Sequence, residues 1–244
     1  MPSSAMATKS ADMSYDGDIA DGYGRLYYKS GKLFYAGDFK RGEMNGMGEM
    51  YFIDGRVYRG SFRHDKITGS GQMEYSNGDV YTGGFINGDC SGYGTIKFAN
   101  GFIYRGNWKK NKMDGYGRID YVDGYYEGYF SNGIRSGSGR KVFYNGTVCE
   151  GMFDEDAMEG YGECSYYNGS FYKGNWMNGI ERGYGIRLYS DGSRKEGIWN
   201  GTAFKVGWIT SPSGDVEYYK DHDKSTKQTE RVVDGRARSD YYYN

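Results

Sequence analysis

Residues 104–124 read YRGNWKKNKMDGYGRIDYVDG, and this stretch decides the fold. A tyrosine, a glycine and a tryptophan occupy alternate positions in Tyr104–Trp108, and the tripeptide Gly115-Tyr-Gly117 follows. Because alternate residues of a β-strand share one face, each half of the stretch is typical of a strand with one aromatic and glycine face. The stretch therefore predicts a β-hairpin whose two strands present the same kind of face.

The same pattern recurs along the chain at intervals of about 23 residues. The aromatic-x-Gly tripeptide begins at Tyr15, Tyr35, Tyr58, Tyr81, Tyr104, Tyr126 and Tyr172, and its slot is filled by Cys149 and Lys195 in two further units. The Gly-x-Gly tripeptide begins at Gly22, Gly46, Gly69, Gly92, Gly115, Gly137, Gly160 and Gly183. This periodicity predicts a tandem array of hairpins.

Turn residues agree with the array. The links between hairpins carry Asn-Gly or Asp-Gly, at Asp54-Gly55, Asn77-Gly78, Asn100-Gly101, Asp123-Gly124, Asn145-Gly146, Asn168-Gly169 and Asp191-Gly192. Such dipeptides favour tight turns with positive φ at both central residues. The turn within each hairpin, such as His64-Asp65, is predicted to be looser. Since every connection is short, we predict an all-β fold, an elongated single-layer antiparallel meander.

Composition excludes several classes of protein. The chain has 42 Gly, 28 Tyr, 18% aromatic residues and a formal net charge of −1. Abundant aromatic residues and balanced charge argue against disorder, and the balanced charge also argues against nucleic-acid binding. The sequence holds no apolar run long enough for a membrane helix and no signal peptide in its first residues. We therefore expect a cytoplasmic protein.

The repeat pattern sets the predicted domain boundaries. Residues 1–13 and 221–244 are polar and lack the period, so we expect disordered tails there. Residues 14–201 form the predicted array. Residues 202–220 keep only a decayed pattern, which we interpret as a degenerate capping hairpin, the usual end of a repeat array.

No catalytic, metal-binding or cofactor-binding constellation is evident. Cys90, Cys149 and Cys164 form an odd set without a C-x-x-C pair, so we expect buried, unreactive thiols and neither a disulfide framework nor a zinc site. His64 and His222 lie far apart and are interpreted as surface residues. The Gly-x-Gly tripeptides lie within predicted strands, which excludes a phosphate-binding loop. The sequence thus predicts a protein that is not an enzyme.

The aromatic face is the candidate binding surface. A single-layer sheet cannot cover both of its sides, so part of this face is expected to remain open as a groove that binds a protein segment, extended or helical. The residues predicted to line this partner-binding groove, besides packing on one another, are Tyr58, Phe62, Tyr81, Phe85, Tyr104, Trp108, Phe130, Tyr172 and Trp176.

The pattern resembles the MORN (membrane occupation and recognition nexus) repeat family. The units of this chain are similar to that family's Y-x-G-x-W/F followed by G-x-G, most fully between Tyr104 and Asp123. The resemblance covers about residues 15–201 and indicates a protein made of eight to nine MORN repeats alone. It implies an adaptor or scaffold at the cytoskeleton or cell cortex, with self-association in some members.

Three other functions stay open. The family name suggests a peripheral membrane or phosphoinositide-binding module, although basic residues form only short pairs such as Lys109-Lys110, so anionic lipid would bind weakly. MORN arrays can also precede a lipid-kinase or methyltransferase domain, but none follows residue 201 here. A choline- or glycan-binding aromatic repeat would require a secreted protein.

Overall fold

The computed structural model describes residues 13–221 and 230–231, and within them it contains β-strands and no helix. The chain divides into two compact units, one of residues 13–122 and 129–133 and one of residues 123–128 and 134 onward. The predicted tails 1–13 and 221–244 lie outside the described residues, apart from Met13, Asp221 and the two-residue strand β20 (Glu230–Arg231). No helix suited to crossing a membrane occurs in the described ranges.

Strands of unit 1 follow one another along the chain. They are β1 (Ser14–Gly17), β2 (Asp21–Tyr27), β3 (Leu33–Lys40), β4 (Glu43–Tyr51), β5 (Val57–Arg63), β6 (Lys66–Glu74), β7 (Val80–Ile86), β8 (Asp89–Lys97), β9 (Ile103–Lys109) and β10 (Lys112–Asp120). Strand β11 (Gly124–Ser131) contributes its last residues to unit 1 and its first residues to unit 2.

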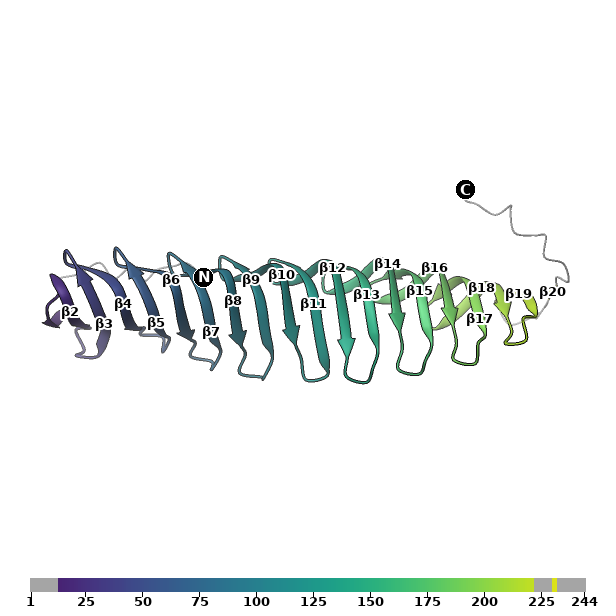
Figure 1. Ribbon diagram of the computed structural model, residues 1–244, viewed down its shortest axis with the longest axis horizontal. Helices are drawn as coiled ribbons and strands as arrows, with labels where there is room; N and C mark the ends of the chain where they lie inside the picture. Colours follow the sequence, from purple (N-terminus) through teal and green to yellow (C-terminus); the bar gives the residue numbers. More distant parts are fainter. Residues whose placement is uncertain (1–12, 222–229, 232–244) are drawn as a thin grey trace. The chain divides into compact units, whose positions relative to one another are not determined.

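Unit 2 continues in the same way. Its strands are β12 (Ile134–Phe143), β13 (Val148–Asp154), β14 (Ala157–Ser165), β15 (Phe171–Met177), β16 (Ile180–Leu188), β17 (Arg194–Asn200), β18 (Ala203–Thr210) and β19 (Val216–Lys220). Within each unit, every strand pairs antiparallel with its neighbour in sequence (Figure 1). The predicted all-β antiparallel meander of consecutive hairpins is confirmed.

The two faces of each sheet differ as predicted. We call the face that carries the repeat tyrosines the inner face and the opposite one the outer face. Strand β5 illustrates the alternation, because Tyr58 and Phe62 are buried whereas Arg59 and Arg63 are exposed. On the outer face, cross-strand ion pairs such as Arg59 with Glu49 are largely solvated, so each stabilises the fold by less than about 1 kcal/mol.

Tyrosine rings build the core of the inner face. The Tyr58 ring makes edge-to-face contacts with Phe62 and Phe85, at centroid distances of 5.3 and 5.0 Å. Its hydroxyl donates to the Ser61 carbonyl at 3.1 Å, and burial raises its pKa to about 12. Aromatic pairs of this geometry add about 1 kcal/mol each beyond the area they bury. The rings therefore hold successive hairpins of unit 1 together without a second layer.

Glycines have two separate roles in the four Gly-x-Gly tripeptides that begin at Gly46, Gly69, Gly92 and Gly115. The first, such as Gly115 with φ 99°, lies at a β-bulge where the pairing of β10 with β9 shifts register. The second, such as Gly117, lies under a tyrosine ring: a Cβ there would overlap the hydroxyl and ring of Tyr104. The sequence predicted this second role, whereas the bulge follows from the backbone conformation.

Turn geometry corrects the sequence-based prediction. The turn within the hairpins has positive φ at both central residues, even at His64 and Asp65, with φ 50° and 61°. In most links between hairpins only the glycine has positive φ, for example Gly55 at 88°, whereas Gly124 lies within β11 without positive φ. Its amide donates to the Phe52 carbonyl at 3.1 Å, while the Asp54 carboxylate accepts from the backbone two residues later. The tight two-residue turns thus lie within the hairpins, and most links span five residues, whereas the link between β10 and β11 spans residues 121–123 and that between β12 and β13 spans residues 144–147.

Candidate functional site

The predicted groove residues form the core. Their side chains are at most 8% exposed, and the tyrosines among them are 0% exposed. The residues concerned are Tyr58, Phe62, Tyr81, Phe85, Tyr104, Trp108, Phe130, Tyr172 and Trp176. These rings therefore pack on one another, as predicted, and they present little surface of their own to a partner. A partner on the inner face has to contact other side chains.

An open cavity does lie on the inner face of unit 2. It has a volume of about 360 Å³ and is lined by Tyr166, Ser170, Trp176, Glu181 and Arg187, together with turn residues of the neighbouring hairpins. Of the nine predicted groove residues, only Trp176 lines it. Aromatic walls combined with a few polar groups are typical of a binding site.

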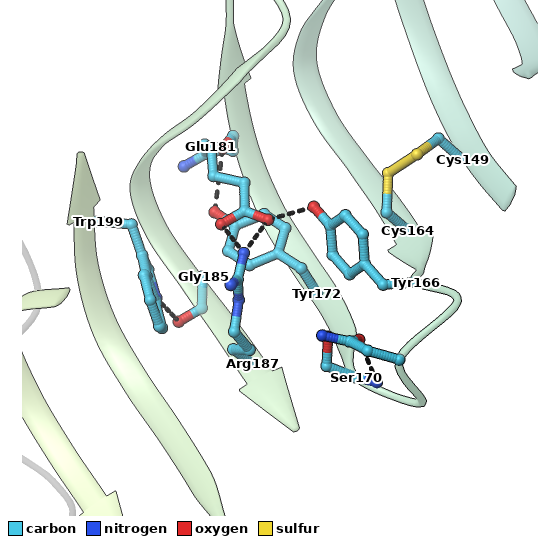
Figure 2. Close-up of polar contacts among 11 residues, drawn as sticks. Cys149, Cys164, Tyr166, Ser170, Tyr172, Glu181, Gly185, Arg187 and Trp199 are labelled. Carbon is cyan, nitrogen blue, oxygen red and sulfur yellow. Dashed lines mark hydrogen bonds and ion pairs between the residues drawn. A yellow bond between two sulfur atoms is a disulfide. The ribbon is translucent and has the colours of Figure 1, made fainter. Parts of the chain in front are cut away.

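A buried ion pair occupies the floor of this cavity. Glu181 is 4% exposed, and its carboxylate accepts hydrogen bonds from the Arg187 guanidinium and from the Tyr166 hydroxyl (Figure 2). The Arg187 guanidinium lies over the rings of Trp199 and Tyr172, at 5.1 and 5.7 Å from their centroids. Burial raises the pKa of the Tyr166 phenol well above its usual range, and the Glu181 charge adds to the rise, so this phenol remains a hydrogen-bond donor.

Two buried nitrogens near this pair lack partners among the described residues. They are Arg187 Nε and Trp176 Nε1. The equivalent indoles of the other repeats do find acceptors, since Trp199 donates to the Gly185 carbonyl at 3.1 Å (Figure 2) and Trp108 donates to the Gly94 carbonyl at 3.2 Å. The cavity therefore has spare donor capacity that its repeat neighbours do not have.

Repeat alignment shows how unusual these residues are. Glu181 and Arg187 occupy the slots that Met44 and Met50 fill in the first complete repeat, where both methionines are buried. In another repeat of unit 2 the first of these slots holds Arg135. Sequence reasoning missed these residues because it treated the slots as core. The available signal was a charged residue where the other repeats carry an apolar one.

A row of directly paired residues crosses each unit on its inner face, and we call it the central row. In unit 1 every member is uncharged, and all but the terminal Tyr15 are at most 7% exposed: Tyr15, Leu26, Tyr35, Met50, Tyr58, Met73, Tyr81, Ile96, Tyr104 and Ile119. In unit 2 the row contains three cations and, at its end on β19, one acid, in the order Lys141, Cys149, Cys164, Tyr172, Arg187, Lys195, Ile209 and Glu217. The two inner faces thus differ in charge although their folds repeat.

The cysteines differ from expectation. Cys149 and Cys164 face each other across β13 and β14 and form a disulfide, so the prediction of two free thiols is wrong (Figure 2). Cys149 replaces a repeat tyrosine, and the Met158 methyl lies against Gly162, where a tyrosine ring lies in other repeats. Cys90 is free and buried as predicted, and burial raises its thiol pKa to about 11.

Other titratable groups lie apart from the cavity. His64 contacts Glu43 at 2.7 Å and is exposed, as predicted. Within residues 13–221 and 230–231, no group of three or more His, Cys, Asp or Glu side chains is close enough to hold a metal ion. The second predicted surface histidine, His222, lies outside the described residues.

Comparison with known families matches the MORN repeat at eight consecutive segments, residues 14–32, 35–55, 58–80, 81–102, 104–124, 126–148, 149–171 and 172–194. The chain belongs to the MORN repeat family. Each matched segment spans roughly one hairpin and its link, so the predicted repeat and the family model agree along most of the array. No curated protein matches the full sequence.

Solved structures with a similar fold are distant in sequence. The TCP10 domain of Danio rerio CPAP, in complex with a peptide of Danio rerio STIL, is 15% identical over 90% of this MORN protein and 99% of that chain, with a TM-score of 0.52. The same domain without peptide is 14% identical over 82% and 89%, with a TM-score of 0.43. The SAS-4 TCP domain of Drosophila melanogaster, with a proline-rich motif of Ana2, is 17% identical over 72% and 90%, with a TM-score of 0.40.

Proposed function

We propose that this MORN array is a non-catalytic scaffold that binds an extended segment of a partner protein on the inner face of unit 2. The observation that carries the proposal is the cavity around Tyr166, Glu181 and Arg187, where the inner face is open and holds polar groups. The sequence-based hypothesis placed the partner along the aromatic residues of the inner face. We now propose that the partner contacts the residues around the cavity on that face and not the buried aromatic core.

The structural neighbour with the fuller match supports this mode of binding. The CPAP domain that shares the fold is described in complex with a peptide of STIL. A single-layer sheet of hairpins offers a peptide a continuous surface whose backbone is already ordered, so little conformational entropy is lost by the scaffold on binding. We extend the proposal to a cytoplasmic site at the cytoskeleton or cell cortex, as the family resemblance implies.

A charge-to-methionine exchange tests the site. The double variant Glu181→Met, Arg187→Met reproduces the pair found in the repeat of Met44 and Met50, so it is expected to fold. The matched control is Glu163→Met, Lys173→Met, which removes an ion pair from the outer face. We expect partners captured from an extract of the source cells to be lost with the first variant and kept with the second.

Site-specific photo-crosslinking locates the contact independently of those variants. A benzophenone amino acid at Tyr166 is expected to crosslink the captured partner, whereas one at Tyr161, which is exposed on the outer face, is not. Crosslinks from Tyr161 alone would move the binding surface to the outer face. Sedimentation with vesicles of phosphatidylcholine and a phosphoinositide tests the alternative function, and binding to vesicles without capture of any protein would favour it.

A further inference from the structure

The inner face of unit 2 carries a row of positive charge with no counterpart in unit 1. Its central row contains Lys141, Arg187 and Lys195, and Arg135 lies on the same face, whereas the acidic side chains at these inner-face positions are Glu181 and, at the β19 end of the row, Glu217. Arg135 is neutralised by Asp156 at 2.9 Å in the adjacent turn. Two lysines therefore remain uncompensated.

Neither lysine has an ion-pair or hydrogen-bond partner within the described ranges. Lys141 Nζ lies 4.5 Å from the centroid of the Phe143 ring, and Lys195 Nζ lies 5.6 Å from that of Tyr189. Both side chains are half-buried. Burial lowers the pKa of Lys141, and the nearby Arg135 lowers it further, while Asp123 opposes the shift. The fold thus holds this lysine in an unfavourable environment.

Arg187 and Lys195 are opposed directly across β16 and β17. Like charges directly opposite each other destabilise a sheet. Glu181 forms an ion pair with Arg187 and so compensates the charge of the arginine only. Charged residues that lower stability in places where sister repeats carry apolar ones are expected where a ligand supplies the missing charge.

We propose that the central row of unit 2 binds an acidic extended segment of the partner, with one acidic residue at Lys195 and Arg187 and another at Lys141. This inference rests on the proposed function and specifies the chemistry of its partner. Strands are spaced by about 4.8 Å, so the four steps from β12 to β16 place Lys141 and Arg187 about 19 Å apart. An extended chain rises about 3.3 Å per residue, so the two acids are about six residues apart.

Geometry favours a peptide over a membrane surface. The cations lie in single file across the strands and are half-buried, so an anion has to enter the inner face to reach them. The intervening members of the row, Cys149, Cys164 and Tyr172, are buried, and they suit apolar residues between the two acids. A bilayer presents its headgroups in a plane and favours exposed basic clusters instead.

Peptide display followed by affinity measurement tests the proposal. The full chain is immobilised and a random-peptide library is selected on it. We expect enriched peptides to carry two Asp or Glu residues about six positions apart. An enriched peptide is then synthesised with a fluorophore, together with a version in which Gln replaces each acid, and both are titrated by fluorescence anisotropy at two salt concentrations. The Gln version is expected to bind at least about tenfold more weakly, and salt to reduce the difference.

Variants of the protein make the test specific. Lys141→Gln, Lys195→Gln is expected to lose the preference for the acidic peptide. The control variant Lys97→Gln, Lys173→Gln removes two positive charges from the outer face. It changes the net charge by the same amount and is expected to keep the preference for the acidic peptide. Circular dichroism shows whether each variant is folded, and if the double variant is unfolded, Lys195→Gln alone is titrated with the same peptides.

The outcomes separate this proposal from the proposed function. Enriched peptides without acids, or equal binding of the acidic and Gln peptides, would overturn the acidic specificity and leave peptide binding intact. No enriched peptide, combined with binding of phosphatidylserine vesicles that Lys141→Gln, Lys195→Gln abolishes, would overturn both and assign the row to a membrane surface. If the outer-face control lost the preference for the acidic peptide to the same extent, that preference would depend on net charge alone and not on the central row.

Discussion

The Tyr104 ring lies against the bare backbone of Gly117, so closely that a Cβ at this glycine would overlap the phenol. Tyr104 is fully buried, and its hydroxyl donates to the Asn107 carbonyl at 2.9 Å. The same contact recurs along unit 1, where a tyrosine covers a glycine on the next strand. This relationship explains why a chain with 42 glycines folds into ordered strands.

Replacing the covered glycine should destabilise unit 1 strongly. We expect Gly117→Ala to lower the free energy of unfolding by about 3 kcal/mol, because the ring cannot move without losing its core contacts. The control Gly101→Ala has open space around the new methyl and positive φ, so it should cost only about 1 kcal/mol of backbone strain. Urea unfolding measures both values, and equal costs at the two sites would contradict the overlap.

The two-residue turns offer a stabilising substitution. Lys110 has φ 49°, a conformation that asparagine tolerates better than lysine. We expect Lys110→Asn to raise the free energy of unfolding by about 0.5 kcal/mol. In contrast, Lys112→Asn lies within β10 and should lower stability, because asparagine disfavours strands. Thermal unfolding measures both variants. Shifts of the unfolding temperature in the same direction would contradict the turn geometry at Lys110.

Lys141 should lower the free energy of unfolding, because it is placed for binding and not for packing. Its folded-state pKa is lowered by burial and by Arg135, so the folded state disfavours the charged form that the unfolded chain adopts freely. We expect Lys141→Met to raise the free energy of unfolding at neutral pH, because the variant removes a cation that burial disfavours. The advantage of the variant should shrink as pH rises through the lowered pKa toward the ordinary lysine pKa of 10.5, because deprotonation removes the penalty in the native protein. A pH-independent difference in urea unfolding would count against this cause.

Thiol counting tests the arrangement of the cysteines. Burial raises the pKa of the Cys90 thiol to about 11, so at pH 8 it should react slowly with a disulfide reagent in the folded protein. Unfolding without reductant should release one reactive thiol per chain, since Cys149 and Cys164 are joined. Unfolding with prior reduction should release three. Three thiols in unreduced, unfolded protein would show that the pair is not bonded in solution.

Repeat spacing made the fold predictable, while several local details were not. The alternation around Tyr58 and Tyr104 predicted strands, faces and their order, because a period of two within a period of about 23 residues allows few other structures. Asn-Gly and Asp-Gly located the links correctly but not their turn type. The five-residue link with glycine after a bend depends on strand twist, which a dipeptide does not encode.

Repetition by itself determined the meander, the tyrosine-on-glycine core and the family, because the same residues recur at each hairpin and local spacing suffices. Only the tertiary structure decided which inner-face side chains stay open and which charges meet. Lys141 lies four strands before Arg187 in the chain, and only strand pairing brings the two into one row, in which Lys195 follows Arg187 across a single link. Cross-strand register therefore decides the chemistry of the binding face, because it depends on bulges and turns and not on the identity of any single repeat.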